Sequence, residues 1–430
     1  MNNLLNAAKR LAGHAAVKNA ALLYLVQISS FVFPLITLPY LSRILGPAKL
    51  GLLTAGQAFI WYFVTLTEYG FDLTATRRVA IQKEDPAGLS KIFSSVMMAK
   101  MLLTLVGFLI MLAVVFATPK LRANWPLYVI SFLTVLGGLL FPMWLYQGVE
   151  KMGLVAARDF AAKLTGTVLV FLVVRQQSDY LWVAVFQSGA MALGGLVSLL
   201  MAPHICGVRF TLPSWKQIRT EYEEGWNVFL SMAALSLTGT NIVILSFVAT
   251  ETEVGYYTAA YRLVVALRGI AIPIIKAVYP YVSHKASKSE SDAVRFLQRY
   301  AFLPVLPFLA GSLILVVAAP WVVQLVFGSQ YEPTVLLLRI MAFSPFLLTV
   351  SNVYSTYFML AFGYSKQWSR IVMQSTVLNY VLLGGLLWFM KPALAMAITF
   401  TAVDLFSVAT AYLFYRKTAP QILARAQTAV

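Results

Sequence analysis

Residues 254–283, VGYYTAAYRLVVALRGIAIPIIKAVYPYVS, decide the fold class of this chain. At about 1.5 Å per residue, a helix of this length can cross a bilayer, and most of its residues are apolar. It also carries Arg262, Arg268 and Lys276 and no acidic residue. At about 100° per residue, the three cations fall within one third of the helix circumference. A cation within a membrane helix usually faces a bundle interior or a wet cavity, so this basic stripe predicts a cavity that holds an anion.

The composition of the whole chain indicates a membrane protein. Of 430 residues, 60% are hydrophobic and 11% are charged, and the mean hydropathy is +0.77. Apolar stretches that are long enough to span a bilayer predict about twelve transmembrane helices. They lie near residues 19–42, 50–73, 92–117, 125–148, 153–174, 180–203, 226–249, 254–283, 300–319, 332–361, 369–390 and 392–415. We therefore predict an all-α polytopic membrane protein.

Two weak internal repeats predict that the chain has two halves. LGPAKLGLLTAGQAF (45–59) and ATETEVGYYTAAYRL (249–263) align at an offset of 204, and GVEK aligns with GYSK at an offset of 215. The coinciding residues are Gly51 with Gly255, Thr54 with Thr258, Ala55 with Ala259, and Gly148 with Gly363. Parallel repeats of this kind are related by an axis along the membrane normal. We predict an N-terminal six-helix lobe (1–203), a cytoplasmic linker (204–225) and a C-terminal six-helix lobe (226–430), related by a pseudo-two-fold axis.

The basic residues of the predicted loops set the orientation. Most of them fall on the side of the membrane that holds the N-terminus, and cytoplasmic loops are the ones enriched in Lys and Arg. With an even number of spans, both termini are predicted to be cytoplasmic.

Charged residues inside the predicted spans are the candidates for a functional site. Some have a local explanation: Lys163 lies one helical turn from Asp159, and Glu68 lies near Arg77 and Arg78. Four charged residues have no evident partner in the sequence. They are Lys100, Arg262, Arg268 and Asp404.

We expect five cations to line the anion cavity: Arg262, Arg268, Lys100, Lys276 and Arg339. The two arginines of the stripe are favoured for phosphate, because a guanidinium can donate two parallel hydrogen bonds to its oxygens. Lys276 and Arg339 are also near enough to helix ends to extend toward water. Asp404 is predicted to be the ion-coupling site, with the alternative that it is a structural partner of a cation such as Arg268 or Lys100.

Other kinds of site lack their sequence signals. There is no GxxxxGK[ST] phosphate loop, no HExxH and no GxSxG. The single cysteine and three dispersed histidines do not indicate a metal site. The loops are too short for a nucleic-acid-binding module, although the formal charge is +17. We predict no catalytic residue, metal, cofactor or nucleic-acid partner.

The first part of the chain carries a resemblance to a known family. Within residues 19–80, PLITLPYLSRILGPAKLGLLTAGQ is followed by EYGFDLTATRRVA, and this hairpin resembles the Wzx-type polysaccharide/O-antigen flippases of the multidrug/oligosaccharidyl-lipid/polysaccharide exporter superfamily. The resemblance implies a bacterial inner-membrane protein that flips undecaprenyl-pyrophosphate-linked oligosaccharides by alternating access. It further implies a cationic cavity and coupling to a proton or sodium gradient. The implied partners are membrane lipids and the polysaccharide polymerase and chain-length regulator of the same pathway.

Two other functions remain open at this point. A drug or cation exporter of the same superfamily would favour a cavity rich in carboxylates and aromatic side chains, whereas the charges inside the spans are net basic. A membrane-embedded polysaccharide polymerase or glycosyltransferase would be expected to show a sizeable extramembranous loop or an acidic catalytic pair. Neither is evident in the sequence.

Overall fold

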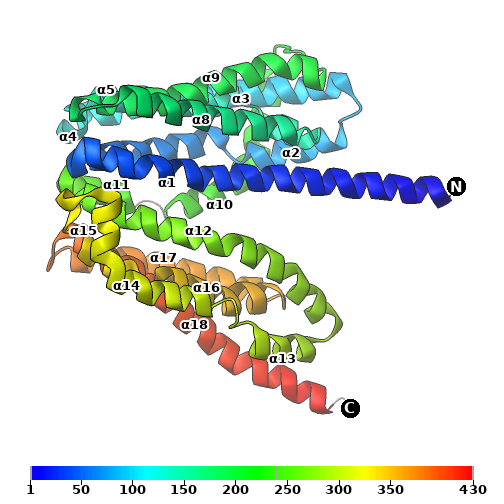
Figure 1. The fold of residues 1–430 in the computed structure, drawn as a ribbon. Helices are drawn as coiled ribbons and strands as arrows, with labels where there is room; N and C mark the ends of the chain where they lie inside the picture. Colours follow the sequence, from blue (N-terminus) through cyan, green and yellow to red (C-terminus); the bar gives the residue numbers. More distant parts are fainter. Residues whose placement is uncertain (1, 238–240, 429–430) are drawn as a thin grey trace. The chain divides into compact units, whose positions relative to one another are not determined.

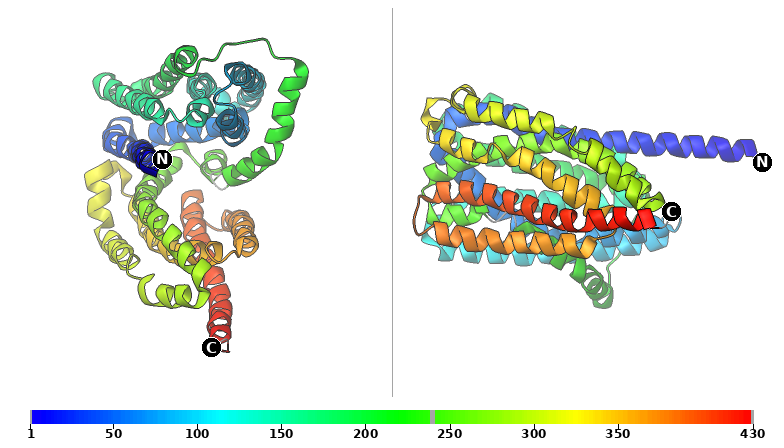
Figure 2. Two further views of the ribbon diagram at one scale, coloured as in Figure 1. Left: turned by 90° about the vertical axis from the view of Figure 1, so that its right-hand side faces the viewer. Right: turned by 90° about the horizontal axis from the view of Figure 1, so that it is seen from below.

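The structure is a computed structural model that describes residues 2–237 and 241–428, with side chains described for 32–151, 153, 157–233, 236 and 241–425. Every regular element in these residues is a helix, which confirms the all-α prediction. Contacts divide the chain into unit 1 (Met1–Phe247) and unit 2 (Val248–Val430), which we describe separately. Within each unit the long helices run roughly alongside one another (Figure 1; Figure 2). The predicted lobe boundary at 204–225 stays a prediction.

The first helix of unit 1 is interrupted by a single glycine. α1 (Asn2–Glu68) contains Gly46 with φ 69° and ψ 174°, followed by Pro47. This backbone conformation is essentially restricted to glycine, because a Cβ atom would clash there. The predicted span 19–42 ends before this break, and the predicted span 50–73 begins after it. The break therefore separates two spans that α1 otherwise joins.

Unit 1 contains further helical elements after α1. They are α2 (Phe71–Ile81), α3 (Pro86–Ala117), α4 (Pro119–Arg122), α5 (Trp125–Ser131), α6 (Leu133–Leu140), α7 (Met143–Gly148), α8 (Met152–Val173), η1 (Gln177–Asp179), α9 (Tyr180–Cys206), α10 (Trp215–Leu237) and α11 (Asn241–Val248). α6 and α9 approach each other closely at two glycines. A Cβ atom on Gly195 would lie 2.5 Å from the carbonyl oxygen of Gly137. Only the absence of side chains allows this packing.

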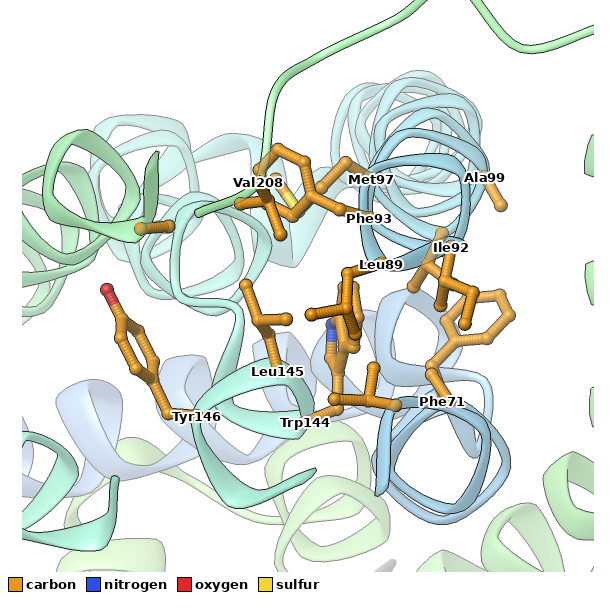
Figure 3. Packing of buried hydrophobic residues seen from close by; sticks show 14 of the residues in the cluster. Phe71, Leu89, Ile92, Phe93, Met97, Ala99, Trp144, Leu145, Tyr146 and Val208 are labelled. Atoms are coloured by element: carbon orange, nitrogen blue, oxygen red, sulfur yellow. The ribbon is translucent and has the colours of Figure 1, made fainter. Parts of the chain in front are cut away.

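A compact apolar core joins α2, α3 and α7. Leu89 and Trp144 lie between Phe71 and Leu145 in the view of Figure 3, and all four side chains are buried. Tyr146 lies beside this cluster, and its hydroxyl donates a hydrogen bond to the carbonyl oxygen of Ser198 on α9. The core thus holds α2, α3 and α7 together.

Polar contacts that the sequence did not indicate hold α10 to the other helices of unit 1. Glu221, only 3% exposed, pairs with Arg78 of α2 and accepts a hydrogen bond of 2.6 Å from the hydroxyl of Ser95 on α3. The hydroxyl of Tyr222 donates to the carbonyl oxygen of Ala99 at 2.9 Å. A buried carboxylate requires such partners, because an unpaired one would be costly.

Unit 2 is built from nine helical elements in its described part. They are α12 (Glu251–Lys288), α13 (Glu290–Tyr300), α14 (Leu306–Phe327), η2 (Ser329–Tyr331), α15 (Thr334–Met341), α16 (Ser344–Tyr354), η3 (Ser355–Leu360), α17 (Ser365–Leu386) and α18 (Pro392–Thr428). α12 starts with a capping box: the hydroxyl of Thr250 accepts from the backbone N–H of Glu253 at 3.2 Å, and the Glu253 carboxylate accepts from the N–H of Thr250. These caps satisfy donors that have no partner within the helix.

The first predicted repeat has buried residues at corresponding positions in the two units. Thr54 and Ala55 in unit 1 are buried, as are Thr258 and Ala259 in unit 2. Each unit also has a similar chain reversal. The N–H of Lys151 donates to the carbonyl oxygen of Tyr146 at 2.8 Å, and that of Tyr364 to Met359 at 2.7 Å.

In each reversal the residue before the donor has positive φ. It is Glu150 in unit 1 (φ 62°) and Gly363 in unit 2 (φ 84°). This is the Schellman arrangement that ends many helices. The predicted alignment of Gly148 with Gly363 is therefore wrong by two residues, because the turn geometry matches Glu150 with Gly363.

In the part of the chain that the structure describes, most of the predicted spans overlap helical segments that could cross a membrane, whereas 153–174, 226–249 and 369–390 do not. Eight helical segments of the described residues are long and apolar enough to cross a membrane by length and composition. One of these eight covers residues 32–81 and so includes parts of two predicted spans. α8 is excluded by its three charged residues Arg158, Asp159 and Lys163. The chain is therefore a multi-pass membrane protein, and a buried charge such as Lys100 lies on one of its most apolar helices.

Candidate functional site

An ion pair between distant helices forms the centre of the candidate site in unit 2. The guanidinium of Arg268 on α12 donates to the Oδ2 atom of Asp404 on α18. The hydroxyl of Ser344, at the start of α16, donates to the same oxygen at 2.5 Å. The two charged side chains are 19% and 18% exposed. Asp404 thus has two donors in a partly buried setting, and three helices meet at its carboxylate.

Aromatic rings surround this ion pair. The guanidinium carbon of Arg268 lies 4.5 Å from the ring centre of Phe400, a cation–π contact. Tyr261 meets Phe400 edge-on at 5.7 Å, and Tyr257 stacks on Tyr261 at 5.9 Å. The Nε atom of Arg268 and the hydroxyl of Tyr257 are buried, and neither has a hydrogen-bond partner among the described residues. The site therefore keeps donor capacity that its own side chains do not use.

Neither Arg268 nor Asp404 has an evident partner nearby in sequence, and the structure pairs them with each other, as the alternative for Asp404 predicted. The role of Asp404 in ion coupling stays a prediction. The two residues are 136 positions apart. Residues this far apart in sequence give no pairing signal, because only packing of α12 against α18 brings them together.

A second buried ion pair lies in unit 1. The ammonium of Lys100 on α3 donates to Oε2 of Glu68 at 2.9 Å and to the carbonyl oxygen of Gly138 at 3.0 Å. Lys100 is 1% exposed and Glu68 is 27% exposed. Behind the pair, the hydroxyls of Thr67 and Thr104 are 3.3 Å apart. Lys100 is buried and its charge is neutralised by Glu68, whereas the side chain of Glu68 is partly exposed at the protein surface.

This pair corrects the predicted partners of Glu68 and gives Lys100 a partner that the sequence did not indicate. Glu68 was expected to pair with Arg77 or Arg78, which follow it closely in sequence. Instead the helix is interrupted at Gly70 (φ 82°) between α1 and α2, and Arg78 pairs with Glu221. The local pair of Asp159 with Lys163 is confirmed, with 2.5 Å between carboxylate and ammonium.

The remaining predicted cations differ in exposure. Arg262 is half-buried on α12, while Lys276 and Arg339 are exposed. The Nε atom of Arg339 donates to the carbonyl oxygen of Val316 at 3.2 Å, which ties α15 to α14. Arg262, Arg268, Lys276 and Arg339 belong to unit 2, and Lys100 belongs to unit 1. A cavity shared by all five stays a prediction.

Sequence reasoning missed three residues that complete the unit 2 site. Ser344 binds Asp404 directly, Phe400 lies against the guanidinium of Arg268, and Tyr257 stacks on Tyr261. Phe400 lies one turn before Asp404 on the same helix, so its position was readable from the sequence once Asp404 was chosen. Ser344 comes from another helix and carried no such signal, whereas Tyr257 lies three turns before Arg268 on the same face of α12 and was readable in the same way.

Known proteins resemble this chain in sequence. Residues 16–285 match the model of the family described as polysaccharide biosynthesis protein. A relative from Escherichia coli (strain K12), named "Putative O-antigen transporter", is 31% identical over 93% of this chain and 96% of its own length. A protein of the same name from Shigella dysenteriae is 30% identical over 90% of this chain and 97% of its own length.

Two solved structures share the fold. The lipid II flippase MurJ in an inward closed conformation superimposes with a TM-score of 0.70 at 13% identity, covering 96% of this chain and 91% of MurJ. The inward-facing conformation of a multidrug resistance MATE family transporter of the MOP superfamily gives a TM-score of 0.65 at 15% identity, covering 92% and 98%. The predicted fold class is thereby confirmed. The family resemblance found in the first hairpin also holds over nearly the whole chain: this protein belongs to the polysaccharide biosynthesis protein family, with the Wzx-type flippases.

Proposed function

We propose that this protein flips undecaprenyl-pyrophosphate-linked oligosaccharide from the cytoplasmic to the periplasmic leaflet of the bacterial inner membrane by alternating access. Two relatives that are at least 30% identical over nearly the full chain carry the name O-antigen transporter, which supports this substrate class. Membrane lipids and the polymerase and chain-length regulator of the same pathway would be its partners. Both termini would be cytoplasmic.

The observation that carries the proposal is the Arg268–Asp404 pair with its unused donor. A pyrophosphate needs compensating positive charge within the membrane, and a guanidinium fork matches its oxygens. The Nε atom of Arg268 has no acceptor among the described residues, so phosphate could engage it. Arg262 lies on the same helix six positions earlier and would add a second guanidinium.

The same pair offers a route to ion coupling. When a phosphate takes the guanidinium of Arg268, Asp404 loses its charged partner and keeps only the hydroxyl of Ser344. A buried carboxylate without a cation binds a proton or a sodium ion more readily, because either one neutralises its charge. Asp404 would thus take up its coupling ion when Arg268 is engaged by phosphate and release it when the ion pair re-forms. Occupancy of Arg268 would thereby couple substrate binding to ion binding at Asp404.

The membrane potential favours the proposed direction of transport. Moving an anion outward across a cytoplasm-negative membrane gains about 2.3 kcal/mol per charge for each 100 mV. A doubly charged pyrophosphate would gain about twice that amount. The ion gradient is then needed chiefly to reset the empty carrier, and Asp404 is the group we assign to that step.

Transport in cells and in vesicles tests the proposal. A strain lacking the protein should accumulate lipid-linked repeat units on the cytoplasmic leaflet, and the wild-type protein should clear them. Asp404→Asn should reach normal membrane levels but transport slowly, with little dependence on an imposed proton or sodium gradient. Arg268→Lys keeps the charge without the fork and should transport at an intermediate rate.

The double variant Arg268→Gln with Asp404→Asn is the matched control, because it removes both charges and leaves no unpaired ion. It should be as abundant as the wild type but inactive. Normal export by this variant would exclude the pair from substrate binding. Gradient dependence that survives in Asp404→Asn would exclude Asp404 from coupling.

The aromatic surroundings of Asp404 support a second candidate function, export of cationic drugs. Phe400, Tyr257 and Tyr261 cluster near a carboxylate, which is a setting that suits an organic cation. Arg268 fills this setting in the structure, so the flippase remains the better-supported proposal. Drug susceptibility of the deletion strain separates the two, since a flippase leaves it unchanged when the cell envelope is otherwise intact.

A further inference from the structure

A cavity in unit 1 that neither Lys100 nor Glu68 lines has the features of a lipid site. It has a volume of about 410 Å³ and lies among residues of α7, α8 and α9. Its wall is formed by small side chains, which include Ala161 and Ala162 of α8 and Ala190 and Gly194 of α9. Small residues at these positions leave open space between helices that would otherwise interdigitate.

One cation, Arg158, borders this apolar cavity. Its Nη2 atom donates to the carbonyl oxygen of Met191 at 2.8 Å, and its guanidinium carbon lies 4.2 Å from the ring centre of Phe141. Its Nε atom is buried and has no hydrogen-bond partner among the described residues. A Cβ atom on Gly194 would lie 3.0 Å from this Nε, so glycine leaves it room.

No carboxylate of the described residues neutralises Arg158. The adjacent Asp159 is bound to Lys163 at 2.5 Å instead. The cavity therefore combines one unneutralised guanidinium, one unused donor and an apolar wall. Such a cation within a membrane helix is stabilised when an anion lies beside it.

The side chains at one edge of the cavity are exposed and apolar. Leu193, Val197 and Met201 of α9 are 66%, 54% and 41% exposed. In a membrane helix, exposed apolar side chains suit hydrocarbon. Arg158 lies six residues after the start of α8, about 9 Å along a helix of about 33 Å. That depth suits a phosphate near the membrane interface, with an acyl chain running deeper.

We propose that this cavity binds one anionic phospholipid, with its phosphodiester on Arg158 and an acyl chain along the wall of alanine and glycine. The single guanidinium matches a single negative charge, as in phosphatidylglycerol. A pyrophosphate carries more charge than one cation compensates. A zwitterionic lipid would bring an ammonium group next to Arg158. The lipid is thus a resident partner, distinct from the transported substrate.

Lipid binding to the purified full-length protein tests this without any transport measurement, so its outcome is independent of the proposed function. Phosphatidylglycerol and phosphatidylethanolamine with the same acyl chains are added to the delipidated protein, and bound lipid is counted by native mass spectrometry. We expect one phosphatidylglycerol to be retained at least tenfold more strongly than phosphatidylethanolamine. Arg158→Gln should abolish this preference, and Arg158→Lys should retain part of it.

Arg175→Gln is the matched control, because Arg175 is an exposed arginine just past the other end of α8. It should bind phosphatidylglycerol like the wild type. If Arg158→Gln does not fold, Ala161→Phe fills the cavity and keeps the charge, and it should also lose the bound lipid. Any of three results would overturn the proposal: equal binding of both lipids, unchanged binding in both cavity variants, or preferential retention of a polyprenyl phosphate. If inorganic phosphate alone stabilises the protein as much as phosphatidylglycerol does, the proposal is also overturned, because the site then binds a free anion.

Discussion

Removing Arg268 should destabilise unit 2, and the structure sets the size of the effect. Arg268→Ala leaves the Asp404 carboxylate with the hydroxyl of Ser344 as its hydrogen-bond donor. Breaking a buried ion pair in this way costs about 3–5 kcal/mol. Both side chains are nearly one-fifth exposed, at 19% and 18%, so the lower end of this range applies. The lost contact with Phe400 adds about 0.5–1 kcal/mol. The expected loss is therefore about 4 kcal/mol.

Thermal unfolding of the purified protein in detergent measures this loss. At about 2–4 °C per kcal/mol for a domain of this size, the midpoint of Arg268→Ala should fall by roughly 8–16 °C. Membrane abundance should fall with it. The double variant Arg268→Gln with Asp404→Asn leaves no unpaired charge and should stay within about 1 kcal/mol of the wild type. Lys391→Ala is the control, because Lys391 is exposed in unit 2 and should change stability by less than about 0.5 kcal/mol.

A specific outcome refutes this reasoning. If Arg268→Ala unfolds at the wild-type temperature, Asp404 does not depend on Arg268 for its stability. If the double variant is as unstable as Arg268→Ala, the cost arises from lost packing and not from an unpaired carboxylate. Either result would also remove the basis for exchange of partners at Asp404.

Three further predictions concern other parts of the chain. Lys100→Ala leaves a partly buried carboxylate unpaired and should lower the stability of unit 1 by about 3 kcal/mol, whereas combining Lys100→Met with Glu68→Gln should recover most of it, as read from denaturant unfolding. Gly195→Ala places a Cβ atom 2.5 Å from a backbone carbonyl oxygen of α6 and should cost about 1–3 kcal/mol, lowering the thermal midpoint; an unchanged midpoint would mean that the helices separate freely. Reporter fusions after Thr250 should report the periplasm and those after Ser287 the cytoplasm, and reversal of both would overturn the orientation.

The sequence was sufficient for the fold class because membrane helices are specified locally. A run of apolar residues of the right length must satisfy its backbone hydrogen bonds within itself, so length and hydropathy alone identify it. The break at Gly46 and the capping box at Thr250 and Glu253 are local for the same reason. The family resemblance was also readable locally, from one hairpin near the N-terminus.

The sequence likewise identified which charges are unusual. Lys100, Arg268 and Asp404 were selected because a charge inside a span is costly without a partner. Each of them takes part in an ion pair between helices. Such charges can be selected from sequence because the free-energy cost of a charge in the membrane depends on the residue type and on its depth. The predicted span gives both.

The partners themselves were decided only by tertiary structure. Arg268 and Asp404 are separated by 136 residues, and Lys100 and Glu68 by 32. A pairing across helices depends on how the helices rotate and pack, and hydropathy carries no information about rotation. The nearest opposite charge in sequence was therefore the wrong choice for Glu68. The Arg158 cavity depends equally on packing, because an open space between α8 and α9 arises from small residues that face each other across two helices.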